Sequence, residues 1–191
     1  LEFRRVLFRS KRMQEIYAEP IKPELVAARL AEVRAAGVPV AGALSPQRTQ
    51  ELYKTVVDAG VDLFVIRGTT VSAEHVSRTG APEPLNLKQF IYELDVPVIV
   101  GGCATYQAAL HLMLTGAAGV LVGVGPGHAC TTRGVLGIGV PQATAIADAR
   151  AARMRHLDET GVYVHLIADG GIRTGGDIAK AVACGADAVM V

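Results

Sequence analysis

The stretch VPVIVGGCATYQAALHLMLTGAAGVLVGVG, residues 96–125, contains one complete strand–helix–strand unit. An apolar strand and its turn at 96–105 precede a segment with apolar residues at three- and four-residue spacing, and a second apolar run follows at 118–125. The same order recurs at 38–68 and at 162–191, where glycine again closes the helical segment. This repetition predicts an α/β fold built from βαβ units.

The predicted strands are continuous runs of Val, Ile, Leu and Ala, which is typical of parallel strands buried on both faces. About six such strands are visible, two fewer than the eight that close a (β/α)₈ barrel. A doubly wound open sheet is the alternative, but no G-x-G-x-x-G sequence follows a first strand and opens a helix. We therefore predict an incomplete (β/α)₈ TIM barrel in which about strands 3 to 8 are present.

The composition narrows the class of protein. The chain has 191 residues, is 50% hydrophobic and carries a formal net charge of +1, which suits one domain and gives no basic footprint for nucleic acid. No apolar run reaches about 18 residues, so we expect no membrane partner. The three cysteines are odd in number and lack metal-ligand spacing. This favours a reduced, cytoplasmic protein.

The sequence also allows predictions about the two ends of the chain and about two linkers between the predicted elements. Residues 1–11 match neither a signal peptide nor a helix cap, and we expect them to be a non-native leader, with the partial barrel catalytic domain at 12–191. The run 187–191 stops inside a predicted strand, so we expect a fragment of a longer protein. The segments 67–86 and 131–142 are predicted to be loops on the active-site face.

The segment GVGPGHAC, residues 123–130, places Cys130 in a glycine-rich loop directly after a predicted strand. In a barrel, the loops after the strand carboxyl ends form the active-site face. Glycines let the backbone approach a ligand, and nearby amides or Arg133 would lower the pKa of the thiol and favour the nucleophilic thiolate. A packing cysteine is the alternative, and the glycine context favours the nucleophile.

The run IADGG, residues 167–171, follows the same logic at another strand end. The Asp169 carboxylate can accept two hydrogen bonds from ribose hydroxyls. Gly170 and Gly171 can present backbone N–H groups to a phosphate, near the positive end of the next helix. The alternative is that Asp169 only caps that helix.

Other chemically active residues are predicted to have structural roles. We expect a surface position for His156 and a hydrogen-bonded position inside the barrel for His165. Cys103 and Cys184 are expected to be packing thiols, and Asp177 an ordinary charge at a helix start.

The segments 125–148, GPGHACTTRGVLGIGVPQATAIAD, and 167–191, IADGGIRTGGDIAKAVACGADAVMV, resemble the IMP dehydrogenase and GMP reductase superfamily. The likeness covers nearly everything after the leader and is closest to an actinobacterial-type paralogue related to the dehydrogenase. It implies that Cys130 attacks C2 of a purine ring to form a covalent intermediate, and that Thr132 helps to activate water or ammonia. The implied partner is a purine nucleoside monophosphate (IMP, XMP or GMP), and the implied assembly is a homotetramer.

The resemblance also implies three sets of binding residues. Substrate binding is implied for His128, Asp169, Gly170 and Gly171. Binding of NAD or NADP is implied for Arg67, Gly123, Val124 and Gly125. A potassium ion is implied at the backbone of Gly125, Gly127 and Cys130.

Three positions depart from the family pattern. Arg67 stands where the dehydrogenases have an aspartate, Gly102 replaces an asparagine, and His128 replaces a phosphate-binding serine. The residues implied for substrate binding thus follow the family pattern more closely than those implied for cofactor binding. Our first hypothesis is IMP dehydrogenase chemistry, from IMP to XMP with NAD. GMP reductase chemistry, from GMP to IMP with NADPH, is the second, and a catalytically idle nucleotide-binding paralogue is the third.

Overall fold

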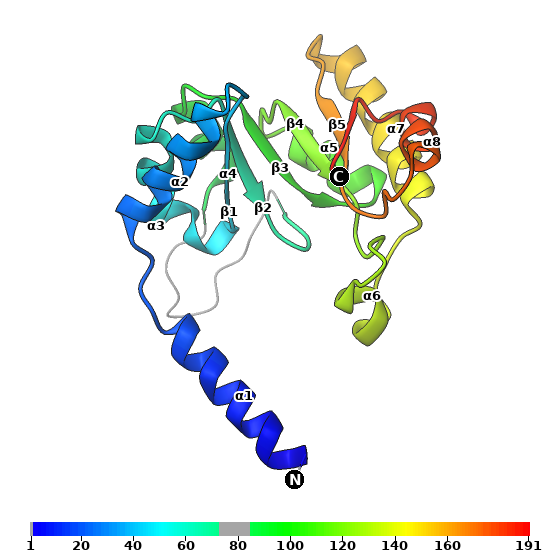
Figure 1. Ribbon diagram of the computed structural model, residues 1–191. Coiled ribbons are helices and arrows are strands. Elements are labelled where there is room, and N and C mark those ends of the chain that lie inside the picture. The colour runs from blue at the N-terminus through cyan, green and yellow to red at the C-terminus, as the bar shows by residue number, and fades with distance from the viewer. Residues whose placement is uncertain (1, 73–84) are drawn as a thin grey trace.

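The computed structural model describes residues 2–72 and 85–191, and its centre is one sheet of six parallel strands (Figure 1). The strands follow one another in chain order across the sheet. They are β1 Ala41–Leu44, β2 Leu63–Arg67, β3 Val98–Cys103, β4 Gly119–Val122, β5 His165–Ala168 and β6 Ala188–Val189. All six occur where the apolar runs predict them, so the predicted α/β class and the parallel arrangement are confirmed.

Helices separate the strands, as a parallel sheet requires. They are α1 Glu2–Tyr17, α2 Pro23–Ala35, α3 Pro46–Asp58, α4 Leu87–Glu93, α5 Tyr106–Met113, α6 Thr131–Leu136, α7 Gln142–Thr160 and α8 Gly175–Cys184. Residues at the helix ends cap the free backbone groups. At the start of α5, for example, the Thr105 hydroxyl accepts a hydrogen bond from the Ala108 amide at 3.2 Å. Gly161 and Gly185 adopt left-handed conformations that end α7 and α8.

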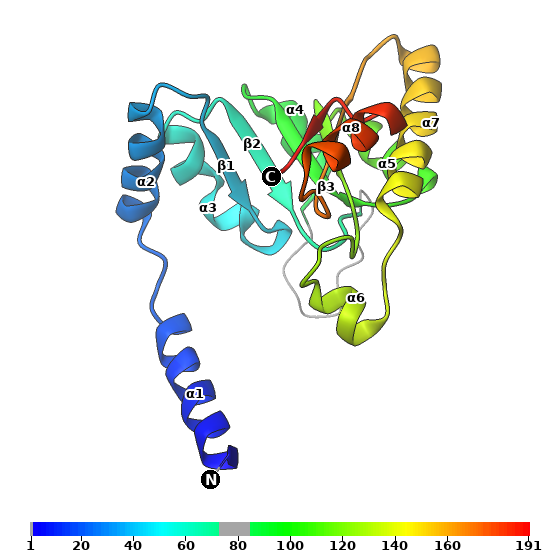
Figure 2. The same ribbon diagram turned by 45° about the vertical axis from the view of Figure 1, so that its right-hand side comes forward.

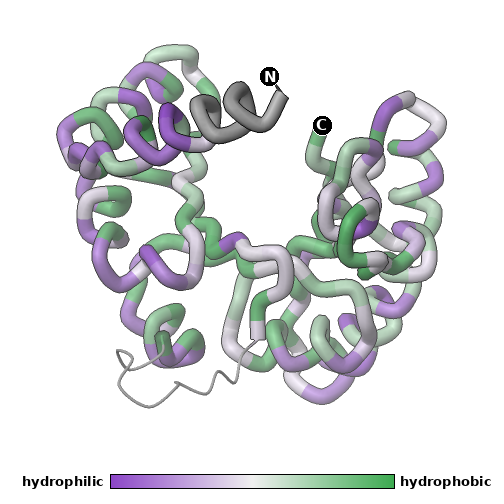
Figure 3. Tube along the Cα trace, turned by 90° about the horizontal axis from the view of Figure 1, so that it is seen from below, coloured by the Kyte–Doolittle hydropathy of each residue, from purple (hydrophilic) through white to green (hydrophobic). Residues whose placement is uncertain are grey.

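The sheet curls into part of a barrel rather than lying open. Viewed along the strands, the chain forms a horseshoe with helices on its outside (Figure 3). Helix α1 stands apart from the sheet in both ribbon views (Figures 1 and 2). The incomplete barrel is therefore confirmed over the described residues, with β1 at one edge and β6 at the other.

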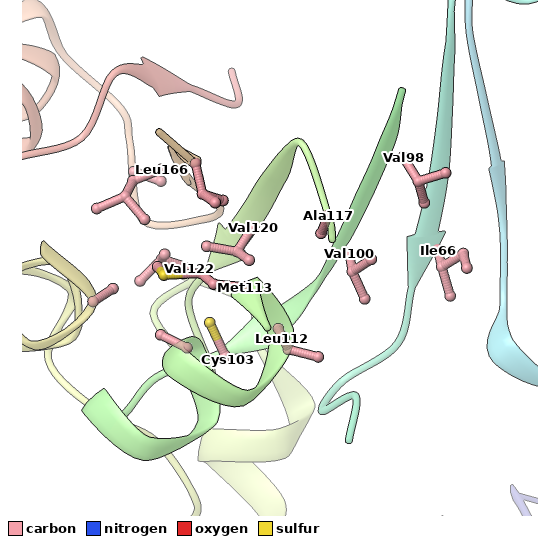
Figure 4. Close-up of a cluster of buried hydrophobic side chains, with 14 of the residues drawn as sticks. Ile66, Val98, Val100, Cys103, Leu112, Met113, Ala117, Val120, Val122 and Leu166 are labelled. Atoms are coloured by element: carbon pink, nitrogen blue, oxygen red, sulfur yellow. The ribbon is translucent and has the colours of Figure 1, made fainter. Parts of the chain in front are cut away.

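The core lies between the central strands and helix α5 (Figure 4). Val100, Val120 and Val122 are fully buried, and Leu112 of α5 packs with them. Cys103 is 2% exposed in this cluster, so its predicted role as a packing thiol is confirmed. Small aliphatic side chains fill this core because the chain has few aromatic residues to do so.

A partly buried ion pair holds the last strand at the amino ends of the barrel. The guanidinium Nη1 of Arg153 donates to Asp187 Oδ2 at 2.6 Å, and only 7% of the Arg153 side chain is exposed. Asp187 also accepts hydrogen bonds from the Leu166 amide at 2.8 Å and the Tyr163 hydroxyl at 2.6 Å. These contacts join α7, β5 and the start of β6 at the end opposite the predicted active-site face.

Three predictions from the sequence are wrong in detail. The predicted loop 131–142 begins with helix α6, because Cys130 takes the N-cap position and Gly137, with φ +68°, closes the turn. His156 is buried rather than on the surface, since α7 packs that face inward and the Val162 carbonyl lies 3.1 Å from its Nδ1. His165 is exposed rather than enclosed, because it begins β5 at the rim of the barrel.

Two further findings concern the predicted loop 67–86 and the question of a membrane-spanning helix. The predicted loop 67–86 lies mostly outside the described residues, which omit 73–84. Among the helices that the structure describes, none combines the length and apolar character needed to cross a membrane.

The two sheet edges generate a prediction for the 191-residue chain. In the described part, β1 pairs only with β2 and β6 only with β5, which leaves backbone donors and acceptors unpaired at both edges. We expect the isolated chain to self-associate and to melt without a sharp transition. Size-exclusion chromatography with light scattering, followed by thermal denaturation, measures both properties. A monomer with a sharp and reversible melt would contradict this expectation.

Candidate active site

The carboxyl ends of β2, β3, β4 and β5 lie beside one another in the parallel sheet. Arg67, the last residue of β2, is in register with Gly101 of β3, and Val122 of β4 is in register with Ala168 of β5. The loops that follow these strands therefore start at one rim, as expected for the active-site face of a barrel.

The backbone of Gly123 joins the end of β4 to the end of β3. Its amide donates to the Cys103 carbonyl at 2.8 Å, and its φ of +152° is unfavourable for residues with side chains. A Cβ at this position would collide with the carbonyl of Asp169, whose own amide donates to the Val122 carbonyl at 2.8 Å. Only glycine allows β4 to end this close to Asp169.

The glycine-rich loop then packs against the turn that follows Asp169. A Cβ on Gly170 would lie 3.1 Å from Pro126 Cγ, and one on Gly171 would lie 3.0 Å from the Pro126 carbonyl oxygen. Both glycines have positive φ, +90° and +80°. The structure thus brings together the two motifs that sequence analysis singled out, although residues 131–166 separate them in the chain.

Cys130 lies half-buried at the start of α6, on the side where the strands end (Figures 1 and 2). The backbone amide of Arg133 lowers the pKa of its thiol below the ordinary value, against an opposing effect of burial. The Thr132 hydroxyl and amide and the Arg133 charge lower this pKa further. Cys103 provides the contrast, because burial raises the pKa of its thiol to about 12. Of these two cysteines, only Cys130 therefore lies in surroundings that favour the thiolate.

Two of the three carbonyls predicted to hold potassium already accept hydrogen bonds. Arg133 Nη2 donates to the Gly127 carbonyl at 3.0 Å, and the Gly134 amide donates to the Cys130 carbonyl at 2.9 Å. A guanidinium thus supplies positive charge to this loop. A potassium ion would have to share the Gly127 carbonyl with Arg133 or replace it.

Arg67 and Asp169 form an ion pair across the rim. Arg67 Nε donates to Asp169 Oδ2 at 3.0 Å, and Nη2 donates to Oδ1 at 3.2 Å. These residues are 102 positions apart, and sequence analysis assigned them to different ligands. Opposite charges at the ends of two predicted strands were the only signal for this contact.

Gln142 is a site residue that sequence analysis missed. It begins α7, and its Nε2 donates to the Val122 carbonyl at 2.7 Å and to the Asp169 carbonyl at 3.3 Å. The side chain therefore bridges the ends of β4 and β5 beneath Gly123. Its position as the first helical residue after Pro141 gave no sign of this role.

The remaining predicted residues differ in what they offer a ligand. The Val124 side chain is 6% exposed and belongs to the core, so only its backbone can face a cofactor. His128 is exposed on the cysteine loop. A Cβ at Gly102 would lie 2.9 Å from the Gly123 carbonyl oxygen, so this backbone has no room for the family's asparagine.

Asp177 does more than the ordinary helix-start charge that was predicted. It forms a capping box with Thr174, and its carboxylate accepts from the amides of Arg173 and Thr174 at 3.2 and 3.1 Å. The Lys180 side chain, then Thr174 and the Arg173 amide, lower the Asp177 pKa to about 2. These amides are engaged, so an incoming phosphate would depend on the Gly170–Gly171 turn instead.

The fold and this rim define an α/β-barrel protein in which a glycine-rich loop that carries a cysteine packs against the turn that follows a strand-end carboxylate. The family model for the IMP dehydrogenase / GMP reductase domain matches residues 19–191. The chain therefore belongs to the IMP dehydrogenase/GMP reductase family.

Known proteins agree with this assignment. An uncharacterized oxidoreductase of Mycolicibacterium smegmatis is 58% identical over 181 residues, covering 94% of this chain and 48% of that protein. Inosine-5'-monophosphate dehydrogenase of Haemophilus influenzae is 42% identical over 170 residues, covering 89% of this chain and 32% of that enzyme. The crystal structure of an IMP dehydrogenase/GMP reductase-like protein from Corynebacterium glutamicum matches with a TM-score of 0.82 and 52% identity, over 93% of this chain and 46% of that one.

These comparisons confirm the predicted family and fold. They also show that the chain spans about half the length of the M. smegmatis relative, 48% of it. The roles of individual site residues stay predictions.

The contrast between the cysteines gives a test of the site. Because hydrogen bonds from Arg133 and Thr132 favour the thiolate, Cys130 should react with iodoacetamide through a pH midpoint below that of a free cysteine, about 8.5. Thr132→Val removes one hydrogen bond to the thiolate and should raise this midpoint, whereas Thr131→Val on the same helix should not. Peptide mapping of the full-length protein measures each rate. Faster labelling of Cys103, or no shift in Thr132→Val, would contradict the assignment.

Proposed function

We propose that the full-length protein is a purine-nucleotide oxidoreductase that acts through a covalent bond between Cys130 and C2 of the purine ring. The observation that carries the proposal is the contact between the cysteine loop and the Asp169–Gly171 turn, through Pro126. A thiol with a lowered pKa and a carboxylate at a strand end thus lie on neighbouring loops. Membership of the family supports a purine nucleotide as the ligand that joins them.

The nucleotide would be held by its ribose and phosphate. Asp169 is fixed by its backbone to Val122 and Gln142, so its carboxylate is a pre-positioned acceptor for the two ribose hydroxyls. Gly170 and Gly171 have no side chains to block a phosphate beside their amides. Binding at these two groups would direct the purine ring toward the loop that carries Cys130.

In the proposed dehydrogenase reaction, the Cys130 thiolate forms a C–S bond at C2 of IMP, and the hydrogen on C2 leaves as a hydride. Bound NAD would supply the acceptor for this hydride. Water then attacks C2 of the resulting thioimidate and the C–S bond breaks. One hydrogen of the water stays on XMP and the other ends on the Cys130 thiol, which restores the thiolate when it loses that proton. The Thr132 hydroxyl, which already contacts Cys130, is placed to hydrogen-bond the attacking water.

The cofactor side fits less well than the substrate side. An acceptor for the hydroxyls of a nicotinamide riboside is replaced by the Arg67 guanidinium, which has only donors and is engaged with Asp169. We therefore derive no contact of NAD or NADP with Arg67. The carbonyls that accept from Arg133 and Gly134 likewise support no step that depends on potassium. The homotetramer also stays a prediction.

The altered cofactor side leaves a second candidate, GMP reductase, because Arg67 stands where a dehydrogenase has an acceptor for the nicotinamide riboside. In that reaction the Cys130 thiolate attacks C2 of GMP, and the 2-amino group takes up one proton and leaves as ammonia. A hydride, which bound NADPH would supply, then adds at C2 as the C–S bond breaks to give IMP and the Cys130 thiolate.

One pair of assays separates the candidates in the full-length protein. We expect absorbance of reduced nicotinamide to rise with IMP and NAD, and Cys130→Ala to abolish this while nucleotide affinity stays within about tenfold, or about 1.4 kcal/mol. Protein quenched during turnover should carry a purine adduct on Cys130 by mass spectrometry.

Other outcomes would change the assignment. Consumption of NADPH with GMP, together with ammonia release, would select the reductase. Full activity of Cys130→Ala would exclude the covalent mechanism. Tight nucleotide binding without turnover in either direction would select the idle paralogue.

A further inference from the structure

The carboxylate proposed to bind ribose already has a partner in the free protein. Both Asp169 oxygens accept from one guanidinium, Oδ2 from Arg67 Nε at 3.0 Å and Oδ1 from Nη2 at 3.2 Å. This two-bond arrangement is the strong form of an arginine–carboxylate pair. It places two donors side by side on one edge of the carboxylate.

The backbones of both partners are held in place. Arg67 ends β2 in register with Gly101, and the next amide, that of Gly68, donates to the Gly101 carbonyl at 2.8 Å. The Asp169 amide donates to Val122, and its carbonyl accepts from Gln142. The side chains meet over the ends of β3 and β4, where Gly101, Gly102 and Gly123 offer no side chain that would separate them.

The Arg67 guanidinium covers one edge of the Asp169 carboxylate. Only 14% of the Asp169 side chain is exposed, whereas 53% of the Arg67 side chain is exposed. Little of the Asp169 carboxylate is therefore left open beside Arg67. A vicinal diol also presents two donors side by side, and it requires the same edge.

We propose that Arg67 is a latch that competes with the ribose diol of a nucleotide for the Asp169 carboxylate. The inference rests on the proposed function, which makes Asp169 the ribose acceptor. In the free protein the guanidinium holds the carboxylate, and a ribonucleotide binds only by displacing it toward solvent. Arg67 is then a residue that sets the strength of ribose recognition, rather than a cofactor contact.

Two ligands that differ only in the diol isolate this competition. IMP and its 2',3'-dideoxy analogue share the base and the phosphate, so the ratio of their dissociation constants cancels the effect of the Arg67 charge on the phosphate. Calorimetry on the full-length protein gives this ratio for wild type and variants. Arg67→Met keeps much of the side-chain bulk but removes both donors, and Arg67→Lys keeps the charge but loses the paired donors.

We expect Arg67→Met to increase the preference for IMP over the dideoxy analogue by roughly two- to fivefold, the scale of a partly exposed ion pair. Arg67→Lys should give a smaller increase. Arg48→Met is the matched control, because Arg48 forms an exposed pair with Glu51 on α3 and should leave the ratio unchanged.

The contrary outcomes are distinct. A decreased ratio in Arg67→Met would show that Arg67 orients Asp169 for ribose, and an unchanged ratio would show no competition; either result overturns the latch. A wild-type protein that binds neither ligand would overturn the proposed function and the latch with it. Circular dichroism of Arg67→Met and Arg67→Lys separates these results from a failure to fold.

Discussion

Gly123 and the Asp169 carbonyl lie so close that no side chain fits between them, and the rim at the carboxyl ends of the strands is organised around this contact. The strand β4 ends there, with the Gly123 amide bonded to Cys103, and the Gln142 side chain bridges the two strand ends from α7. Because β4 and β5 end together, the loop after β4 has to pass over the turn after β5. Pro126 therefore packs on Gly170 and Gly171, and the cysteine loop is directed to the proposed nucleotide site.

Cys103 and Cys130 show how the same fold gives one residue type two kinds of chemistry. Cys103 ends a central strand inside the apolar cluster, where burial disfavours a thiolate and raises its pKa to about 12. Cys130 lies beyond the strand ends, where amides and the hydroxyl of Thr132 favour the charged form. A position inside a strand or in the loop beyond one thus separates a packing thiol from a thiol whose surroundings favour the thiolate.

The parts that sequence analysis predicted correctly depend on local pattern. Continuous Val and Ile runs mark strands buried on both faces, and glycines mark helix ends, so the six strands and their parallel order follow from the chain alone. The contacts that it missed depend on tertiary geometry. The Arg67–Asp169 pair exists only because the sheet curls, and Gln142 reaches two strand ends only because α7 returns over them. The burial of His156 likewise depends on which face of α7 meets the sheet.

The cysteine loop and the Asp169 turn are proposed to bind one nucleotide together, and a crystal structure of the full-length protein with bound IMP would test this. We expect one IMP molecule whose ribose hydroxyls both hydrogen-bond to Asp169 and whose C2 lies about 3.5 Å from Cys130 Sγ, within reach of attack. An IMP molecule that bonds to Asp169 while its base points away from Cys130, or one bound elsewhere, would contradict it.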